Sequence, residues 1–265
     1  MSHIHTTIHS PFIGMDDKRR LLSSKGFRAG LEGNQIDLTS PMTAAITDDF
    51  VGASLDATKW ATFKGSDGGA GYFAHLASEA NGVARGVAGA GAGASMAVNG
   101  TSLVSFLNWQ AQAGGLSFQA RVKVDAITNL SLFIGLGDQI AALQQPIVAA
   151  GATTITTTAV DAVGFLFDTT FTAQTWHGVG VANNVDAAIQ NFNVAPVAAT
   201  YADFRITLDK NGVAYFFYNG KPIGSAMTGA VTKTVSLTPV IAAFTRSAST
   251  VNVDVDLLHT SALRI

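Results

Sequence analysis

The chain has 265 residues, of which 48% are hydrophobic and only 13% are charged, with a net charge of −2. This composition supplies enough apolar surface for a folded core, so it excludes intrinsic disorder as the main state. It gives no overall basic surface for nucleic acid or for an anionic membrane. The absence of cysteine excludes disulfide scaffolds, thiolate metal centres and cysteine nucleophiles.

The acidic residues are almost all aspartate, because Glu32 and Glu79 are the two glutamates of the sequence. Glutamate and lysine are favoured on exposed helix faces, so their scarcity argues against a helical protein. We see neither a secretory signal nor a run of about twenty apolar residues that would cross a membrane. The positive mean hydropathy of +0.29 reflects alanine and valine instead.

Residues 1–47 differ from the rest of the chain and are expected to form an N-terminal arm with one short helix. Asp16 and Asp17 precede a run of basic residues, which suits the two ends of a helix dipole. We expect the arm to contact an acidic partner or a neighbouring subunit through Lys18, Arg19, Arg20, Lys25 and Arg28. Three histidines are weak candidates for a metal site, and a flexible polar terminus is the alternative: His3, His5 and His9.

Residues 48–265 are predicted to form one all-β domain. The segment 116–124 alternates between apolar and polar side chains, which indicates a strand with one buried and one wet face. The apolar runs 130–136 and 163–167 are typical of strands buried on both faces. We expect further strands at residues 204–208, 213–218, 221–225 and 251–257.

Turn residues separate these strands and indicate a two-sheet antiparallel sandwich. Asn219-Gly220 is the strongest local signal, because both residues tolerate the positive φ angles of a tight hairpin. The Gly/Ala-rich segment 85–100 has the composition of a linker, but alternating small residues also suit a flat strand, which we favour.

Catalytic patterns are scarce. Asp254 and Asp256 form the one pair of carboxyl groups with strand spacing inside a strong strand pattern, and we interpret them as a solvated outer face. The sequence has no Gly-x-Ser-x-Gly elbow for a hydrolytic triad. A calcium site would draw on Asp168, Asn183, Asn184 and Asp186, whose spacing matches no EF-hand loop.

The order of motifs in residues 48–264 resembles the concanavalin A-like lectin and glucanase group of jelly-roll domains. The most specific stretch runs from Phe204 to Lys221, where a strand, a turn and a second strand end in Asn-Gly-Lys. Asp48-Asp49-Phe50 with Leu55 to Trp60 resembles the opening strand and turn, and Val253 to Asp256 resembles a closing strand. The resemblance implies a two-sheet jelly-roll sandwich.

Catalytic members of that group carry Glu-x-Asp-x-x-Glu on one strand of the concave face, and neither glutamate of this chain lies in such a pattern. We therefore expect no enzyme activity. The stretch from Asp161 to Asp168, followed by Trp176 to Asn183, is similar to jelly-roll proteins of tailed-phage virions, which carry an N-terminal arm.

These resemblances lead us to expect a non-enzymatic bacteriophage capsid decoration protein on the virion surface. Its partners would be the major capsid protein and further copies of itself, with no cofactor, nucleic acid or membrane. The alternative is a carbohydrate-binding module displayed on the virion, which needs exposed aromatic side chains. Its candidate glycan-facing residues, for which packing in the core is the alternative use, are Trp109, Trp176, Tyr215 and Tyr218.

Overall fold

The computed structural model describes residues 43–264 except 78, 80, 107, 108 and 140. The arm residues Lys18, Arg19, Arg20, Lys25 and Arg28 and the histidines His3, His5 and His9 therefore lie outside the described residues. The chain divides into two units, residues 1–44 and 45–265. Strand β1 (Thr43–Asp48) crosses the boundary that we expected after residue 47, and the extent of the arm stays a prediction.

The alternating segment 116–124 forms strand β6 (Leu116–Val124), whose even-numbered residues are buried. It lies between β14 (Ala202–Leu208) and β18 (Val251–Leu263) in an antiparallel sheet that we call sheet A. Among the described residues this sheet has the order β16-β15-β14-β6-β18-β4-β3, and β1 also pairs with β18. The remaining strands of sheet A are β3 (Gly71–His75), β4 (Ala84–Ala88), β15 (Ala214–Tyr218) and β16 (Lys221–Met227).

The two apolar runs form β7 (Leu130–Gly137) and β10 (Ala162–Asp168), and every residue of both strands is buried. They are neighbours in sheet B, whose order in the described chain is β12-β11-β10-β7-β17-β5-β2, with β13 paired to β11. The other strands of this sheet are β2 (Trp60–Lys64), β5 (Thr101–Ser105), β11 (His177–Ala182), β12 (Val185–Asp186), β13 (Gln190–Asn191) and β17 (Thr238–Thr245).

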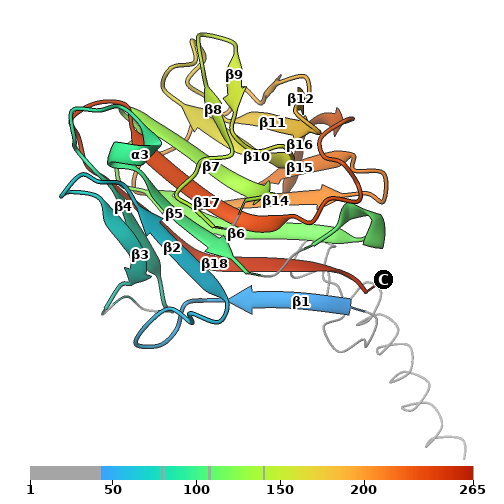
Figure 1. Cartoon of the computed structure of the whole chain (residues 1–265), viewed down its shortest axis with the longest axis horizontal. Coiled ribbons are helices and arrows are strands. Elements are labelled where there is room, and N and C mark those ends of the chain that lie inside the picture. Colours follow the sequence, from blue (N-terminus) through green and yellow to red (C-terminus); the bar gives the residue numbers. More distant parts are fainter. Residues whose placement is uncertain (1–42, 78, 80, 107–108, 140, 265) are drawn as a thin grey trace, which may run out of the picture. The chain divides into compact units, whose positions relative to one another are not determined.

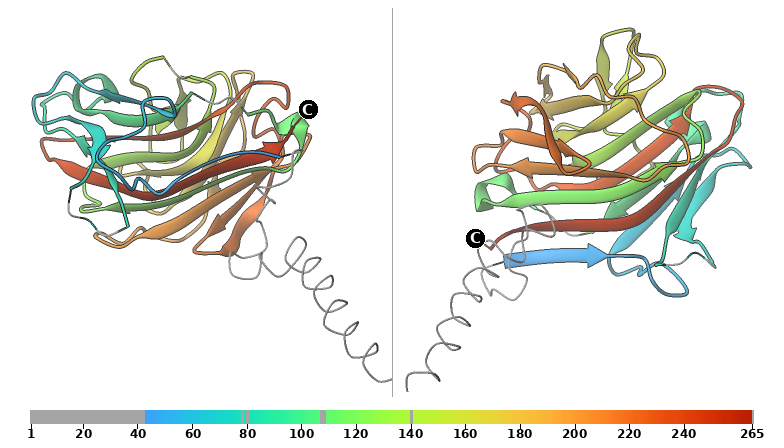
Figure 2. Two further views of the ribbon diagram at one scale, coloured as in Figure 1. Left: turned by 90° about the horizontal axis from the view of Figure 1, so that it is seen from below. Right: turned by 180° about the vertical axis from the view of Figure 1, so that it is seen from behind.

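The two sheets pack face to face, which confirms the predicted all-β antiparallel sandwich (Figure 1). Figure 2 shows the same layers from two further sides, with the orange strands β14 to β16 in the layer of β18. Aromatic rings join the sheets: Phe165 of β10 lies 5.1 Å from Phe204 and 5.2 Å from Phe216, centroid to centroid. Edge-to-face ring pairs of this kind stabilise a core beyond their buried area.

The outer face of sheet B is covered by the chain itself. A hairpin of β8 (Ile147–Ala149) and β9 (Ile155–Thr157) lies against it, as Figure 1 shows beside β7 and β10. The side chains of Phe133, Leu166 and Val240 pack under this cover together with Ile147. This packing explains why the central strands of sheet B are continuous apolar runs.

Two glycines show how close this packing is. Gly135 and Gly164 are paired across β7 and β10. A Cβ atom on Gly164 would lie 2.5 Å from the ring of Phe133, and one on Gly135 would lie 2.2 Å from the carbonyl oxygen of Val163. Both positions therefore require glycine, because a larger side chain would clash with these neighbouring atoms.

Asn219 and Gly220 adopt φ angles of 46° and 76° and join β15 to β16, as the dipeptide predicts. The strand that we favoured for residues 85–100 was wrong beyond Ala88. Strand β4 ends there, a loop follows, and residues Met96–Asn99 form the short helix α3. The loop glycines pack against polar side chains, because a Cβ on Gly89 would lie 2.4 Å from the Asp67 carboxylate.

One turn of 3₁₀ helix, η2 (Ala111–Ala113), is the other short helix of the described residues. No helix in this part of the chain has the length and apolar character needed to span a membrane.

Candidate functional site

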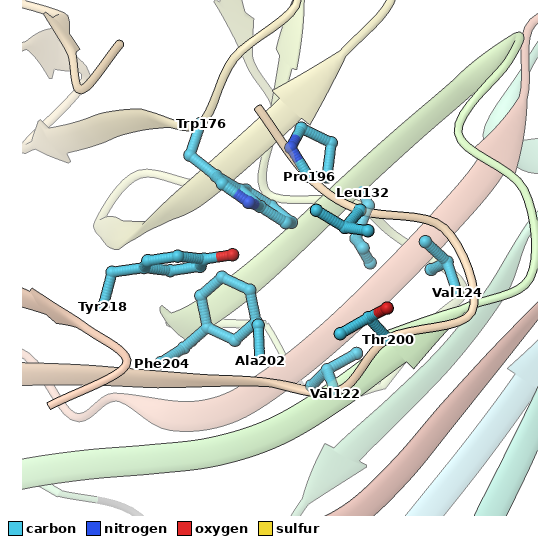
Figure 3. A pocket seen from close by; sticks show the side chains of 10 residues that line it. Val122, Val124, Leu132, Trp176, Pro196, Thr200, Ala202, Phe204 and Tyr218 are labelled. Carbon is cyan, nitrogen blue, oxygen red and sulfur yellow. The ribbon is translucent and has the colours of Figure 1, made fainter. Parts of the chain in front are cut away.

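A pocket opens between the two sheets at the end of the sandwich where β6 ends and β14 begins (Figure 3). It encloses about 260 Å³ of space that is partly open to solvent. Strands of both sheets and the segment 196–200 supply its lining: Val122, Val124, Leu132, Trp176, Pro196, Val197, Thr200, Ala202, Phe204 and Tyr218.

The segment 192–200 forms the rim of the pocket, and backbone hydrogen bonds hold it in place. The amide of Trp176 donates to Val194 O at 2.8 Å, and the amide of Phe192 donates to Trp176 O at 3.0 Å. The amide of Ala199 donates to Val124 O at 2.7 Å. Val197, which also lines the pocket, is 60% exposed on this rim. The opening of the pocket to solvent therefore lies beside Val197.

Aromatic rings make one wall of the pocket. Trp176 lies just before β11 in sheet B, whereas Phe204 and Tyr218 belong to neighbouring strands of sheet A. The ring of Trp176 is 4.7 Å from that of Phe204, which is 5.5 Å from the ring of Tyr218. The close-up shows the indole and the phenol edge converging above Phe204 (Figure 3).

The polar atoms of this wall are incompletely paired. Burial raises the pKa of the Tyr218 hydroxyl, and hydrogen-bonding interactions with the side chains of Trp176 and Asn219 lower it only in part. The buried indole N–H of Trp176 faces the Tyr218 hydroxyl without the geometry of a full hydrogen bond, and no other acceptor among the described residues meets it (Figure 3). A buried N–H without an acceptor costs stability, and an oxygen atom of a ligand can satisfy it.

The four aromatic residues that we proposed as glycan-facing lie in three places. Trp176 and Tyr218 come together in the pocket. Trp109 is buried, where its backbone pairs with Leu237, and Tyr215 is 42% exposed at a distance from the pocket lining. Sequence reasoning missed Phe204, Thr200 and the valines of β6 as pocket residues, because the alternation of β6 and β14 indicates only that such side chains face inward.

Asp254 is not on a solvated face, as we had interpreted it. Its side chain is buried and accepts hydrogen bonds from Arg85 Nε at 2.6 Å and from Arg85 Nη2 at 2.8 Å. Lys123 Nζ lies 2.9 Å from Asp254 Oδ2, the oxygen that also accepts from Arg85 Nη2. Burial acts to raise the pKa of Asp254, but the bonds from these two cations outweigh it and hold the pKa below its ordinary value.

Asp256 has the opposite electrostatic environment. Burial raises its pKa, Arg121 opposes this effect, and the charges of Asp203 and Asp49 reinforce it. A pair of carboxyl groups with diverging pKa values is the usual arrangement of an acid and a base. Here, however, cations occupy both oxygens of Asp254, so this carboxylate joins β4, β6 and β18 instead of facing a ligand.

The expected oxygen ligands for calcium do not come together either. Asp168 is fully buried and accepts hydrogen bonds from Arg246, Ser131 and the backbone amides of Ala149 and Thr170. Within the described ranges, no group of three or more histidine, cysteine, aspartate or glutamate side chains is arranged to hold a metal ion.

The comparisons with known proteins identify the fold. No protein-family model and no curated protein sequence matches this chain. Its structure is similar to that of a β-1,3-glucanase from Mycobacterium marinum, with a TM-score of 0.54 and 12% identity over 81% of this chain and 97% of the other. A β-glucanase from Bacillus licheniformis gives a TM-score of 0.54 and 10% identity over 82% and 97% of the two chains.

A third similar structure is the κ-carrageenase from Pseudoalteromonas carrageenovora, determined with an oligosaccharide of κ-carrageenan. It gives a TM-score of 0.51 and 12% identity over 86% of this chain and 98% of that chain. These likenesses confirm the concanavalin A-like jelly-roll sandwich that the motif order predicted.

The same comparisons overturn our two functional expectations. The neighbours with a stated activity reported above are enzymes that act on carbohydrates, and none is a virion component. The prediction of a non-enzymatic capsid decoration protein is therefore wrong, as is the prediction that the chain is not an enzyme. The virion prediction relied on the arm and on the resemblance of residues 161–183 to phage proteins, and the prediction of no activity relied on one missing glutamate pattern. An absent pattern excludes one catalytic arrangement and leaves other chemistry on the same fold open.

Proposed function

We propose that this chain is a carbohydrate-active β-sandwich that binds one sugar unit in the pocket between Trp176 and Tyr218. The observation that carries the proposal is the convergence of these two rings, from different sheets, with their polar edges at one pocket wall. Flat aromatic rings suit the C–H face of a sugar, while the phenol and the indole N–H supply hydrogen bonds at their edges.

The pocket is small. Its space of about 260 Å³ includes solvent outside the protein surface, so at most the end or a branch of a glycan can enter it, and not several consecutive units. The glycan-active enzymes among the structural neighbours favour a carbohydrate over other small ligands at the level of the fold.

The proposal is tested with the full chain on a glycan array, followed by calorimetry with the sugars that bind. Replacing Tyr218 with phenylalanine removes one hydroxyl from the pocket wall, and we expect the affinity to fall about tenfold, as for one lost hydrogen bond. Tyr215→Phe is the matched control, because it removes the same group from an exposed position on the same strand. Its affinity should equal that of the unchanged chain.

A reducing-end assay on each bound glycan shows whether binding is accompanied by cleavage. The absence of any glycan ligand, or an equal loss of affinity in both tyrosine variants, would contradict the proposed site.

A further inference from the structure

Asparagine followed by glycine occurs four times in the chain, at residues 81–82, 99–100, 211–212 and 219–220. This dipeptide can modify itself, because glycine has no side chain to keep its backbone nitrogen away from the asparagine carboxamide. The reaction is an attack within the chain, so the positions of the two reacting groups determine its rate. The four copies therefore compare one dipeptide in four environments of the same fold.

The copy at Asn99 is the most protected. Asn99 is fully buried, and its Nδ2 donates to Gly91 O at 3.0 Å and to Thr245 O at 3.3 Å. The amide of Gly100, which would have to attack, donates to Met96 O at 2.9 Å at the end of helix α3. Both reacting groups are held, so the reaction requires this part of the structure to open.

The two copies that flank β15 each have one reacting group held. In the turn before the strand, where Asn211 lies, the amide of Gly212 donates to Asp209 O at 3.0 Å. In the turn after it, Asn219 Oδ1 accepts from the amide of Asp203 at 2.9 Å. One hydrogen bond must break in either turn before the nitrogen reaches the carboxamide carbon, which we expect to slow the reaction about fivefold.

Asn81 differs from all three other asparagines. Its side chain is exposed in the connection between β3 and β4. Within the part of the chain that the structure describes, no hydrogen bond holds this side chain or the amide of Gly82. Gly82 is buried, and a Cβ on it would lie 2.4 Å from Asp49 O. Packing therefore restrains the glycine, but the attack at Asn81 requires no hydrogen bond to break.

We infer that Asn81 is a site of covalent self-modification, at which its carboxamide is converted to aspartate and isoaspartate. The Gly82 nitrogen loses its proton to hydroxide and bonds to Asn81 Cγ, while the bond from Cγ to Nδ2 breaks and ammonia leaves. Water then opens the resulting five-membered succinimide at either carbonyl carbon. The product carries a new carboxylate and, as isoaspartate, a longer backbone directly before the glycine that packs against Asp49.

The test follows the full chain during incubation in mildly alkaline buffer, with tandem mass spectrometry of proteolytic peptides to assign the product to each asparagine. Each rate is divided by the rate in the same chain unfolded in guanidinium chloride, so the quotient measures protection by the fold. We expect Asn81 to be protected at least about fivefold less than Asn211 and Asn219. It should be protected about a hundredfold less than Asn99, where three hydrogen bonds must break.

A variant tests whether hydrogen bonding causes this difference. Asp209 Oδ1 accepts from the amides of Asn211 and Val213 at 2.8 Å and 3.0 Å, so Asp209→Ala loosens the turn before β15. The Asn211 rate should rise about fivefold, while the Asn81 rate should stay the same. Asp186→Ala, which removes an exposed carboxylate from β12, is the matched control and should change neither rate.

The inference would be overturned if folding protected Asn81 as strongly as Asn211 or Asn219. An Asn211 rate that does not respond to Asp209→Ala would also overturn it. The measurement uses no sugar, so its outcome is independent of the proposed function.

Discussion

Two regions of sheet B differ in how completely their buried polar groups are hydrogen-bonded within the chain. On the outer face, Asp168 is fully buried and receives its hydrogen bonds from Arg246, Ser131 and two backbone amides of the same chain. At the inner edge, the buried N–H of Trp176 faces the Tyr218 hydroxyl, meets no acceptor with full hydrogen-bond geometry in the described part of the chain, and borders a pocket. The first arrangement holds strands together, whereas the second retains capacity for a ligand.

This difference indicates which part of the sandwich is available to bind a ligand. The Asp168 cluster connects β7, β10 and the residue after β17 to the hairpin of β8 and β9, because Arg246 also donates to Ala149 O at 2.9 Å. The hairpin and the apolar side chains under it occupy the outer face of sheet B. The described pocket lies instead between the sheets.

The largest expected effect comes from breaking the Asp168 cluster. Arg246→Met leaves a fully buried carboxylate without its cation, and we expect a loss of about 3–5 kcal/mol in the free energy of unfolding. Urea denaturation measures it. Lys59→Met, which breaks the more exposed pair with Asp48, is the control and should cost less than about 1 kcal/mol. Equal losses in the two variants would refute the structural role of the cluster.

A smaller effect is expected from filling space on the outer face of sheet B. Gly164→Ala places a Cβ 2.5 Å from the Phe133 ring, and overpacking of this kind costs about 1–3 kcal/mol. Thermal unfolding followed by circular dichroism measures the change. Gly68→Ala is the control, since a Cβ there meets no atom within 4 Å. If the Gly164→Ala protein were as stable as this control, the outer face of sheet B would accommodate the additional methyl group, and the prediction would be wrong.

The smallest expected effect is a pH dependence of stability from His177 on the same face. Burial lowers its pKa, while a hydrogen bond to Thr175 O at 2.9 Å raises it in part. The unfolded chain therefore takes up a proton more readily, so stability should decrease as the pH falls below about 6.5 and should be complete above it. Urea midpoints at pH 7.5 and pH 5.5 measure the decrease.

His177→Gln should reduce this slope without removing it, because burial also lowers the pKa of His259. A slope unchanged by the substitution would contradict the assignment to His177. The contribution of Asp254 belongs to a separate range, because its lowered pKa stabilises the fold above about pH 4 and is lost in more acidic solution.

The sequence by itself determined several of the strands and which faces they bury, although it did not show that β4 ends at Ala88. Alternation in residues 116–124, the apolar runs of β7 and β10 and the Asn219-Gly220 turn are local signals, because they depend on neighbours within a few residues. Only the tertiary structure decided which of the inward-facing side chains meet. Val124, Trp176 and Tyr218 come from three distant segments in two sheets, so the pocket exists only once those sheets are packed.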